Sequence, residues 1–161
     1  TPDYASKGWD AALNRICMWA KFRDIRQKKE FYVFNTHFDH VGTIAREKSA
    51  QLITERIENI RKNFPVFCLG DFNASSSDIN FYSQMTRKLS DSKNLTKNIK
   101  GSTGTFNGWE FTKNHFPANV LIDYIFVDKI KVLKYKVITD KTPKQSYPSD
   151  HFPVVIHCKL K

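Results

Sequence analysis

Cysteine is scarce in this sequence, and its placement excludes a disulfide-rich or zinc-stabilised fold. The 161 residues include only 3 cysteines, an odd number, at Cys17, Cys68 and Cys158. None of them belongs to a Cys-x-x-Cys pair, and each lies within an apolar, strand-like stretch. Small buried side chains are therefore a better interpretation than disulfide partners or metal ligands.

Long apolar runs, repeats and low-complexity segments are also absent. No stretch approaches the ~20 apolar residues of a membrane-spanning helix, so we expect no transmembrane segment. The first five residues lack the basic and apolar parts of a signal peptide. A processed or trimmed chain would begin in the same way, and the sequence leaves a cytoplasmic and a secreted location open.

Acidic residues are fewer than basic ones, 16 against 26, and the formal net charge is +10. This charge favours anionic partners such as nucleic acid, phosphorylated small molecules or anionic lipid. We expect the cations to be scattered over turns and outer helix faces, so charge permits a polyanionic substrate without identifying one. The scattered set comprises Arg26, Lys28, Lys29, Arg61, Lys62, Lys97, Lys100, Lys141 and Lys144.

Apolar residues are present in the amounts that a folded domain needs. Hydrophobic residues make up 40% of the chain and aromatic residues 14%, which excludes a disordered protein. The length suits one domain with a real core. We therefore expect a single domain over residues 1–161.

The first half of the chain predicts a hairpin followed by a helix. Residues 16–24 and 30–38 are rich in aromatic and apolar side chains and predict antiparallel strands, with both faces of the second strand largely covered. Residues 43–63 have the apolar spacing of a helix that covers a sheet, with Leu52 among the inward residues and Thr43 as N-cap. Arg46 is electrostatically unfavourable in the first turn, which suggests a substrate-binding role.

The second half predicts a short helix and three strands. The helix is expected at about residues 79–88, capped by Ser77 or Asp78, and an exposed connection follows over residues 89–104. An aromatic loop at residues 105–118 is either one wall of a cleft or a packed surface loop. Strands are predicted at residues 120–127, 130–139 and 152–160.

The central feature is an apolar run at residues 66–69 that stops at Gly70 and presents Asp71 and Asn73. If the backbone stays extended, these two side chains project to the same side of a buried strand. A carboxylate can take a proton from an attacking water, and an amide can donate to a phosphate oxygen. The same tetrapeptide also forms common turns, in which both side chains bond to their own backbone.

Other polar groups lie at or near the ends of predicted strands. His37 ends the second strand, Asp123 interrupts an apolar strand, and Ser149-Asp150-His151 precedes the last one. A buried Asp123 needs a partner, and a histidine bonded to it would be held in one tautomer. Asp150 could serve a hard cation such as Mg²⁺. Taken singly, a histidine such as His37 is more often a satisfied rim histidine, and a Ser-Asp-His sequence is more often a turn.

Four motifs occur in a diagnostic order. They are Asn35-Thr36-His37, Gly70-Asp71-Phe72-Asn73, Ile122-Asp123-Tyr124-Ile125-Phe126 and Pro148-Ser149-Asp150-His151-Phe152-Pro153-Val154. Together they resemble the endonuclease/exonuclease/phosphatase family of metal-dependent phosphoesterases. The resemblance implies an α/β (α+β) fold of the DNase-I-like kind, a layered β-sandwich flanked by helices, with Mg²⁺ or Mn²⁺ as cofactor.

The resemblance also implies roles for individual residues. Asp71 is the base or water-orienting acid, and His37 and Asn73 stabilise the phosphate in its transition state. Asp123 pairs with His151. The resemblance places Asp150 near the cation and makes Asp39, two residues beyond His37, a candidate for substrate binding.

The beginning of the chain departs from the family pattern. Family members open with a strand that carries an Asn and a second strand whose Glu binds the metal, and nothing before Ile16 matches either. The chain thus resembles the C-terminal part of a family domain. We expect weak or absent metal affinity and turnover, and an open apolar sheet face that a missing N-terminal segment or a second chain covers.

The substrate stays open at this stage. Residues 122–126 and 148–151 look most like the deadenylase and nocturnin branch of the family, and residues 149–154 are near the secreted nucleases and sphingomyelinases. The expected substrate is therefore a phosphodiester or phosphate ester, either nucleic acid or a smaller molecule. The alternatives are a non-catalytic basic module that holds polyanions, an inactive fragment of the enzyme, and a purely structural domain.

Overall fold

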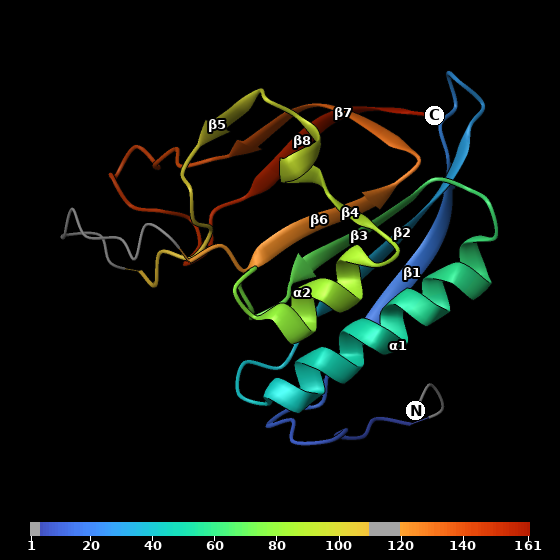
Figure 1. Ribbon diagram of the computed structural model, residues 1–161. Coiled ribbons are helices and arrows are strands. Elements are labelled where there is room, and N and C mark those ends of the chain that lie inside the picture. The colour runs from blue at the N-terminus through green and yellow to red at the C-terminus, as the bar shows by residue number, and fades with distance from the viewer. Residues whose placement is uncertain (1–3, 110–119) are drawn as a thin grey trace.

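Two β-sheets and two helices form three layers in the computed structural model, which describes residues 4–109 and 120–161 (Figure 1). The predicted two-sheet α/β fold is confirmed. In the larger sheet the strand order is β1 (Cys17–Arg23), β2 (Glu30–His37), β3 (Val66–Asp71), β6 (Asp123–Asp128) and β4 (Ser90–Asp91). The smaller sheet contains β5 (Ile99–Gly101), β7 (Ile130–Val137) and β8 (Val154–Leu160).

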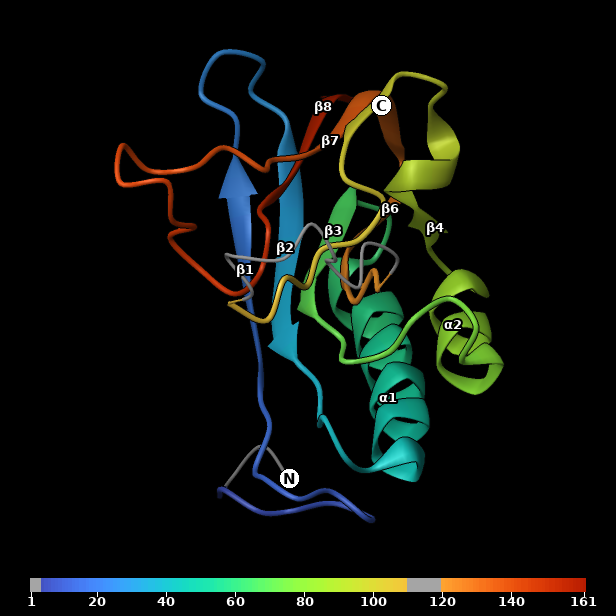
Figure 2. The same ribbon diagram turned by 90° about the vertical axis from the view of Figure 1, so that its left-hand side faces the viewer.

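The main core lies between the larger sheet and the helices. Helices α1 (Thr43–Arg61) and α2 (Ile79–Thr86) lie together on one side of that sheet (Figure 2). Alternate residues of the central strands point toward them, and Phe34, Cys68 and Phe126 are buried there. Because this face of the sheet is packed against the helices, the opposite face is the one that remains for a site.

The opposite face is covered only in part. Phe67 and Ile125 pack against side chains of β7 and β8, so the smaller sheet covers the middle strands. On β1, however, Met18 is 61% exposed and Phe22 is 48% exposed. The expectation that both faces of β2 are largely covered is wrong, because Asn35 and His37 on this side are exposed.

Helix α1 is capped by a segment distant in sequence. Gly42, and not Thr43, is its N-cap, and no side-chain hydrogen bond of its own caps the helix. Asp10 accepts hydrogen bonds from the backbone N–H groups of Ile44 at 3.2 Å and Ala45 at 2.6 Å. A Cβ at Gly42 would lie 2.6 Å from the Asp10 carboxylate, so glycine leaves room for this cap. Local sequence could not predict a cap that arrives from outside the helix.

Replacing Asp10 tests this cap. Asp10→Ala should lower the free energy of unfolding by about 1 kcal/mol, since two N-terminal amides of α1 lose their acceptor. Urea denaturation of the 161-residue chain measures the change. Asp140→Ala, at an exposed loop position, is the matched control and should have little effect. Equal stability of the two variants would mean that Asp10 does not cap the helix.

The buried face of α1 includes charged residues that the apolar pattern assigned to the outside. Arg46 and Arg61 are 9% and 7% exposed, whereas Leu52, predicted inward, is 45% exposed. Arg61 is held by Glu58 and Asp128, each at 2.5 Å. Burial of this guanidinium is tolerated because both partners are charged and close.

The connection predicted to be exposed at residues 89–104 is partly built into the fold. It contains β4, the 3₁₀ helix η1 (Ser92–Leu95) and β5, and Asp91 and Ser92 are buried. The predicted cleft wall at residues 105–118 is described only as far as residue 109, so residues 111–118 lie outside the described residues.

Three strands that carry candidate site residues meet one rim of the larger sheet. Strand β2 ends at His37, β3 ends at Asp71 and β6 begins at Asp123. Within residues 4–109 and 120–161, no helix has the length and apolar character needed to cross a membrane.

Candidate active site

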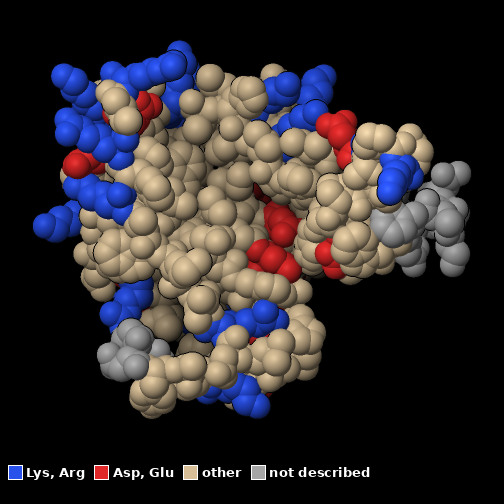
Figure 3. Space-filling model, turned by 180° about the vertical axis from the view of Figure 1, so that it is seen from behind, with Lys and Arg blue, Asp and Glu red and all other residues tan. Residues whose placement is uncertain are grey.

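His37, Asp71 and Asp123 stand abreast on neighbouring strands, and we call them the rim row. His37 of β2 lies opposite Asp71 of β3, and Asp71 lies opposite Asp123 of β6. Residues at matched positions on adjacent strands point to the same face, here the face away from the helices. His37 Nε2 lies 3.3 Å from Asp71 Oδ2. On this face acidic side chains gather in a hollow (Figure 3).

His151 joins the rim row from the loop that precedes β8. Its Nδ1 lies 2.8 Å from Asp123 Oδ2, and its Nε2 lies 3.8 Å from Asp71 Oδ2. The ring of Phe106 packs edge-on against the imidazole, with centroids 5.1 Å apart. Burial alone would lower the pKa of His151, but the hydrogen bond and the charge of Asp123 outweigh it and raise the pKa above its ordinary value.

Removing the charge of Asp123 should lower the pKa of His151. In Asp123→Asn the histidine loses its charged acceptor, so NMR titration of the imidazole should show a downward shift relative to the wild-type chain. A raised pKa means that His151 stabilises the fold fully below the unfolded-state value of ~6.5 and that this contribution is lost as pH rises through the folded pKa. Asp123→Asn should remove that pH dependence.

Asp140→Asn removes an equal charge from an exposed loop position and serves as the control. Its His151 titration should overlay that of the wild-type chain. An unchanged His151 titration in Asp123→Asn would contradict the paired arrangement.

Asp71 lies at the centre of the group. Burial and the nearby charge of Asp123 raise its pKa, while the N–H of Asn73 and the two histidines lower it, and the net direction is upward. Its side chain is 15% exposed, so the carboxylate still reaches solvent. A carboxylate with a raised pKa is a stronger base than an ordinary aspartate, which suits it to accept a proton from water.

Gly70 allows β3 to approach β2 just before Asp71. Its φ is +144°, and a Cβ added there would lie 1.8 Å from the carbonyl oxygen of Thr36. No other residue type fits this conformation without strain. The place of Asp71 beside His37 therefore depends on a glycine one residue earlier.

Asn73 does not continue the strand, so the extended alternative is wrong and the turn that the sequence left open is found instead. Its φ is +48°, a left-handed conformation that asparagine tolerates. Its backbone N–H donates to Asp71 Oδ1 at 2.8 Å, and its side-chain Nδ2 donates to the carbonyl of Phe38 at 3.0 Å. Asn73 thus fixes the Asp71 carboxylate and joins the loops after β2 and β3.

Sequence reasoning missed Thr105 and Asn107, which are both fully buried. The Thr105 hydroxyl accepts hydrogen bonds from the N–H groups of Ile122 and Asp123 at 3.1 Å each. Asn107 Nδ2 donates to the carbonyl of Ser149 at 3.0 Å, and its own N–H donates to that of Asp150 at 2.7 Å. These residues connect the start of β6 to the His151 loop. The signal available in the sequence for these two residues was their position as polar residues near Gly104 in an aromatic loop.

Asp39 and Arg46 lie together beside the rim row and bond to the protein itself. The Asp39 carboxylate accepts from the N–H groups of Ala12, Leu13, Val41 and Gly42. These donors outweigh burial and hold its pKa well below the ordinary value. Arg46 Nη1 donates to the Asp39 carbonyl at 3.2 Å, and Arg46 Nε lies 3.7 Å from Asp78. Arg46 therefore links the loops that follow β2 and β3.

A possible metal site is formed by Asp71, Asp123 and His151, each of which offers one ligand atom within 4.8 Å of the others. Asp123 Oδ2 and His151 Nδ1 already bond to each other, which leaves Asp71 and His151 Nε2 as the freer donors. Two carboxylates and an imidazole fit a divalent cation. Asp150, expected near the cation, is outside this group, and its Oδ1 lies 3.4 Å from the hydroxyl of Ser149.

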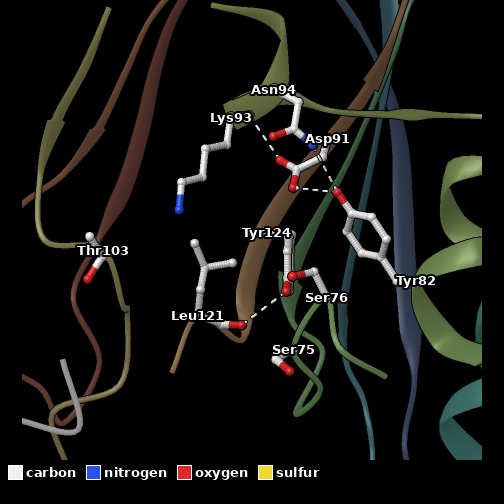
Figure 4. A pocket seen from close by; sticks show the side chains of 9 residues that line it. All are labelled: Ser75, Ser76, Tyr82, Asp91, Lys93, Asn94, Thr103, Leu121 and Tyr124. Carbon is white, nitrogen blue, oxygen red and sulfur yellow. Dashed lines mark hydrogen bonds between the residues drawn. The ribbon is translucent and has the colours of Figure 1, made fainter. Parts of the chain in front are cut away.

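A cavity of about 310 Å³ lies on the other side of β6 and includes no residue of the rim row (Figure 4). Its polar groups bond largely to one another. Tyr82 donates its hydroxyl to Asp91 and accepts from Asn94, while Tyr124 donates to the carbonyl of Leu121. Burial and the charge of Asp91 raise the pKa of Tyr82 to about 12. This network supports β6 from behind.

Comparison with known proteins identifies the family of the chain. Residues 5–151 match the Endonuclease/Exonuclease/phosphatase family. The chain belongs to this family. Family members are hydrolases that act on phosphoester bonds. An uncharacterized protein of Acanthamoeba polyphaga mimivirus is 27% identical over 97% of this chain and 60% of its own length.

Two bacterial protein structures superpose closely on the chain. A conserved protein of unknown function from Enterococcus faecalis is 31% identical, with a TM-score of 0.87, over 97% of this chain and 60% of its own. The mannosyl-6-phosphatase of Bacteroides thetaiotaomicron is 36% identical, with a TM-score of 0.85, over 96% of this chain and 61% of its own. The chain thus spans about 60% of the length of these relatives.

Proposed function

We propose that the protein is a divalent-metal-dependent hydrolase of phosphate esters whose site is the rim row with His151. The observation that carries the proposal is that four polar side chains from three strands and a loop meet at one place. His37 and His151 both face Asp71 Oδ2, and His151 also bonds to Asp123. Acids and histidines at this spacing can activate water and bind a phosphoryl group.

Each residue has a distinct role in this proposal. Asp71 orients the attacking water and accepts its proton. Asp123 holds the His151 ring through Nδ1 and leaves Nε2 facing Asp71, where it can donate to a phosphate oxygen. His37, whose side chain is 57% exposed, and the second amide hydrogen of Asn73 stabilise negative charge on the phosphate. Asp39 and Arg46 act on substrate through the loops that they hold.

A cation would be held by the carboxylate of Asp71, with Asp123 or Asp150 completing the ligand set, while His151 Nε2 stays free to donate to the phosphate. We favour Mg²⁺ or Mn²⁺, because the site is rich in carboxylates and open to water. When bound, it would supply charge that offsets the developing negative charge on the phosphoryl oxygens. The acidic hollow by itself repels an anionic substrate, so the residues present need such a charge.

The substrate in this proposal is a phosphate ester. The candidates are nucleic acid, a small phosphodiester and a sugar phosphate. The support for a sugar phosphate is the 36% identity to a protein named as a mannosyl-6-phosphatase. We also propose that a further segment of the same protein, or a second chain, covers the open face beside Met18 and Phe22. That segment would supply a metal-binding Glu, for which nothing before Ile16 offers a match.

Hydrolysis assays test the proposed function. The 161-residue chain and the longer protein encoded by the gene would be assayed with bis-p-nitrophenyl phosphate, mannose 6-phosphate, nucleic acid and sphingomyelin, with and without Mg²⁺. We expect metal-dependent hydrolysis by the longer protein, its loss in EDTA and in His151→Ala, and weak or no turnover by the 161-residue chain. Brisk turnover by the short chain would contradict the need for a further segment. Failure of the longer protein on every substrate would contradict the function.

A further inference from the structure

Cations from separate parts of the chain gather at the end of the molecule opposite the rim row. The Lys29 ammonium donates to the backbone carbonyl of Leu160. The backbone N–H of Lys161 donates to the backbone carbonyl of Lys129, and the Lys129 ammonium donates to the backbone carbonyl of Asn63. These contacts bring together the β1–β2 turn, the end of β8, the β6–β7 turn and the end of α1. We call this surface the basic end; its cations are Arg23, Arg26, Lys28, Lys29, Lys62, Lys129, Lys131, Lys159 and Lys161.

The gathering corrects the expectation of scattered charge for Arg26, Lys28, Lys29 and Lys62, whereas the other cations of that set lie outside the basic end. The basic residues from the turn, the strand ends and the helix end are distant in sequence but adjacent in the fold, and Lys131 lies opposite Lys159 on paired strands. Figure 3 shows many basic side chains at one corner of the molecule, with a few acidic ones among them, and smaller basic groups elsewhere, including beside the acidic hollow. Charge is thus separated along the strands, with acids at the rim row and bases at the other end.

The cations of the basic end have no acidic partners among residues 4–109 and 120–161. The ion pairs of the described chain involve other cations, such as Lys21 with Glu30 and Arg61 with Asp128. Asp24, the remaining acid of the turn, accepts hydrogen bonds from the backbone N–H groups of Arg26 and Gln27. The basic end therefore has uncompensated positive charge available to a partner.

An apolar side chain lies at the tip of the basic end. Ile25, in the turn between β1 and β2, is 88% exposed. The turn stands out from the body of the fold (Figure 1). An exposed aliphatic side chain surrounded by Arg23, Arg26 and Lys28 suits the boundary between anionic headgroups and acyl chains.

We propose that the basic end docks the protein on an anionic lipid surface, with Ile25 inserted at the headgroup level. Nucleic acid would use the same charge, but the apolar side chain at the tip of the turn is the aliphatic Ile25, which offers no ring on which a base could stack. The basic end lies about 23 Å from the rim row, at ~3.3 Å per residue along β2. Docking therefore leaves the acidic hollow open to dissolved substrate. This surface does not depend on the proposed catalytic activity.

Vesicle binding of the 161-residue chain tests the proposal. Sedimentation with phosphatidylcholine vesicles containing 30% phosphatidylserine should show binding that falls as NaCl is raised, and pure phosphatidylcholine should show little. Arg26→Ala/Lys28→Ala should weaken binding about 25-fold, at roughly five-fold per cation. Ile25→Ser should weaken it without changing the salt dependence, because it removes insertion and leaves charge intact.

Lys97→Ala/Lys100→Ala removes the same charge from exposed positions outside the basic end and is the matched control. It should bind nearly as tightly as the wild-type chain. Equal losses in both double variants would overturn the assignment of the surface, because net charge alone would then explain binding. Binding to single-stranded DNA through the basic end, with no binding to anionic vesicles, would overturn the choice of partner.

Discussion

Gly70→Ala should destabilise the protein by at least about 3 kcal/mol, and chains that still fold should lose the contact between His37 and Asp71. The reason is geometric. The new Cβ would lie 1.8 Å from the carbonyl oxygen of Thr36, which is backbone and cannot swing aside. Strand β3 would have to move away from β2, and the positive φ adds strain of its own. Urea denaturation measures the loss of stability.

Gly8→Ala is the matched control, because a Cβ at Gly8 meets nothing within 4 Å. That variant should keep wild-type stability within about 0.5 kcal/mol. If Gly70→Ala were equally harmless, the close approach of β3 to β2 would not be needed to place Asp71. The rim row would then have to be positioned by its loops alone.

Asp71→Asn should lower the turnover of the longer protein by about 10²- to 10⁴-fold, the contribution typical of a positioned general base. The amide keeps the size of the side chain and can still meet His37, but it cannot accept a proton from water. Asp71 Oδ2 also faces both His37 and His151, so the charge that orients both imidazoles is lost. Steady-state kinetics with the best substrate found for the longer protein measure this change, and the loss should appear in kcat more than in KM.

Asp140→Asn, at an exposed loop position, is the isosteric control and should retain full turnover. The stability of both variants should be compared first, because relief of the repulsion between Asp71 and Asp123 could make Asp71→Asn more stable than the wild type. A folded Asp71→Asn protein with wild-type kcat would exclude Asp71 as the base.

Sequence patterns predicted those parts of the fold that depend on local periodicity. The hairpin of β1 and β2 and helix α1 from Thr43 were predicted, and Asp78 is one of the two residues predicted to cap α2. The errors occur where a partner comes from a distant segment. Asp10 caps α1 from outside the helix, and Asp128 makes the burial of Arg61 tolerable. Residue spacing alone contains no information about such contacts.

In the candidate site, too, some features could be predicted from the sequence and others could not. The proximity of His37, Asp71, Asp123 and His151 could be predicted, because strand ends meet at a rim and a buried acid needs a partner. The turn at Asn73 was one of the two alternatives that the sequence left open, but the bond of its side chain to the loop after β2 could not be predicted. Hydrogen bonds that join separate loops, as with Asp39 and Thr105, are tertiary features, and residue type alone does not predict their partners.

A Mn²⁺ titration of the ¹⁵N-labelled 161-residue chain tests most directly whether the rim row is a cation and phosphate site. Paramagnetic broadening at low Mn²⁺ should remove the amide signals around His37, Asp71, Asp123 and His151 first, even if affinity is weak. Asp71→Asn should abolish this pattern, and inorganic phosphate added in a diamagnetic Mg²⁺ sample should shift the same signals. Broadening centred on Asp91 and the cavity behind β6, or broadening unaffected by Asp71→Asn, would contradict the proposed site.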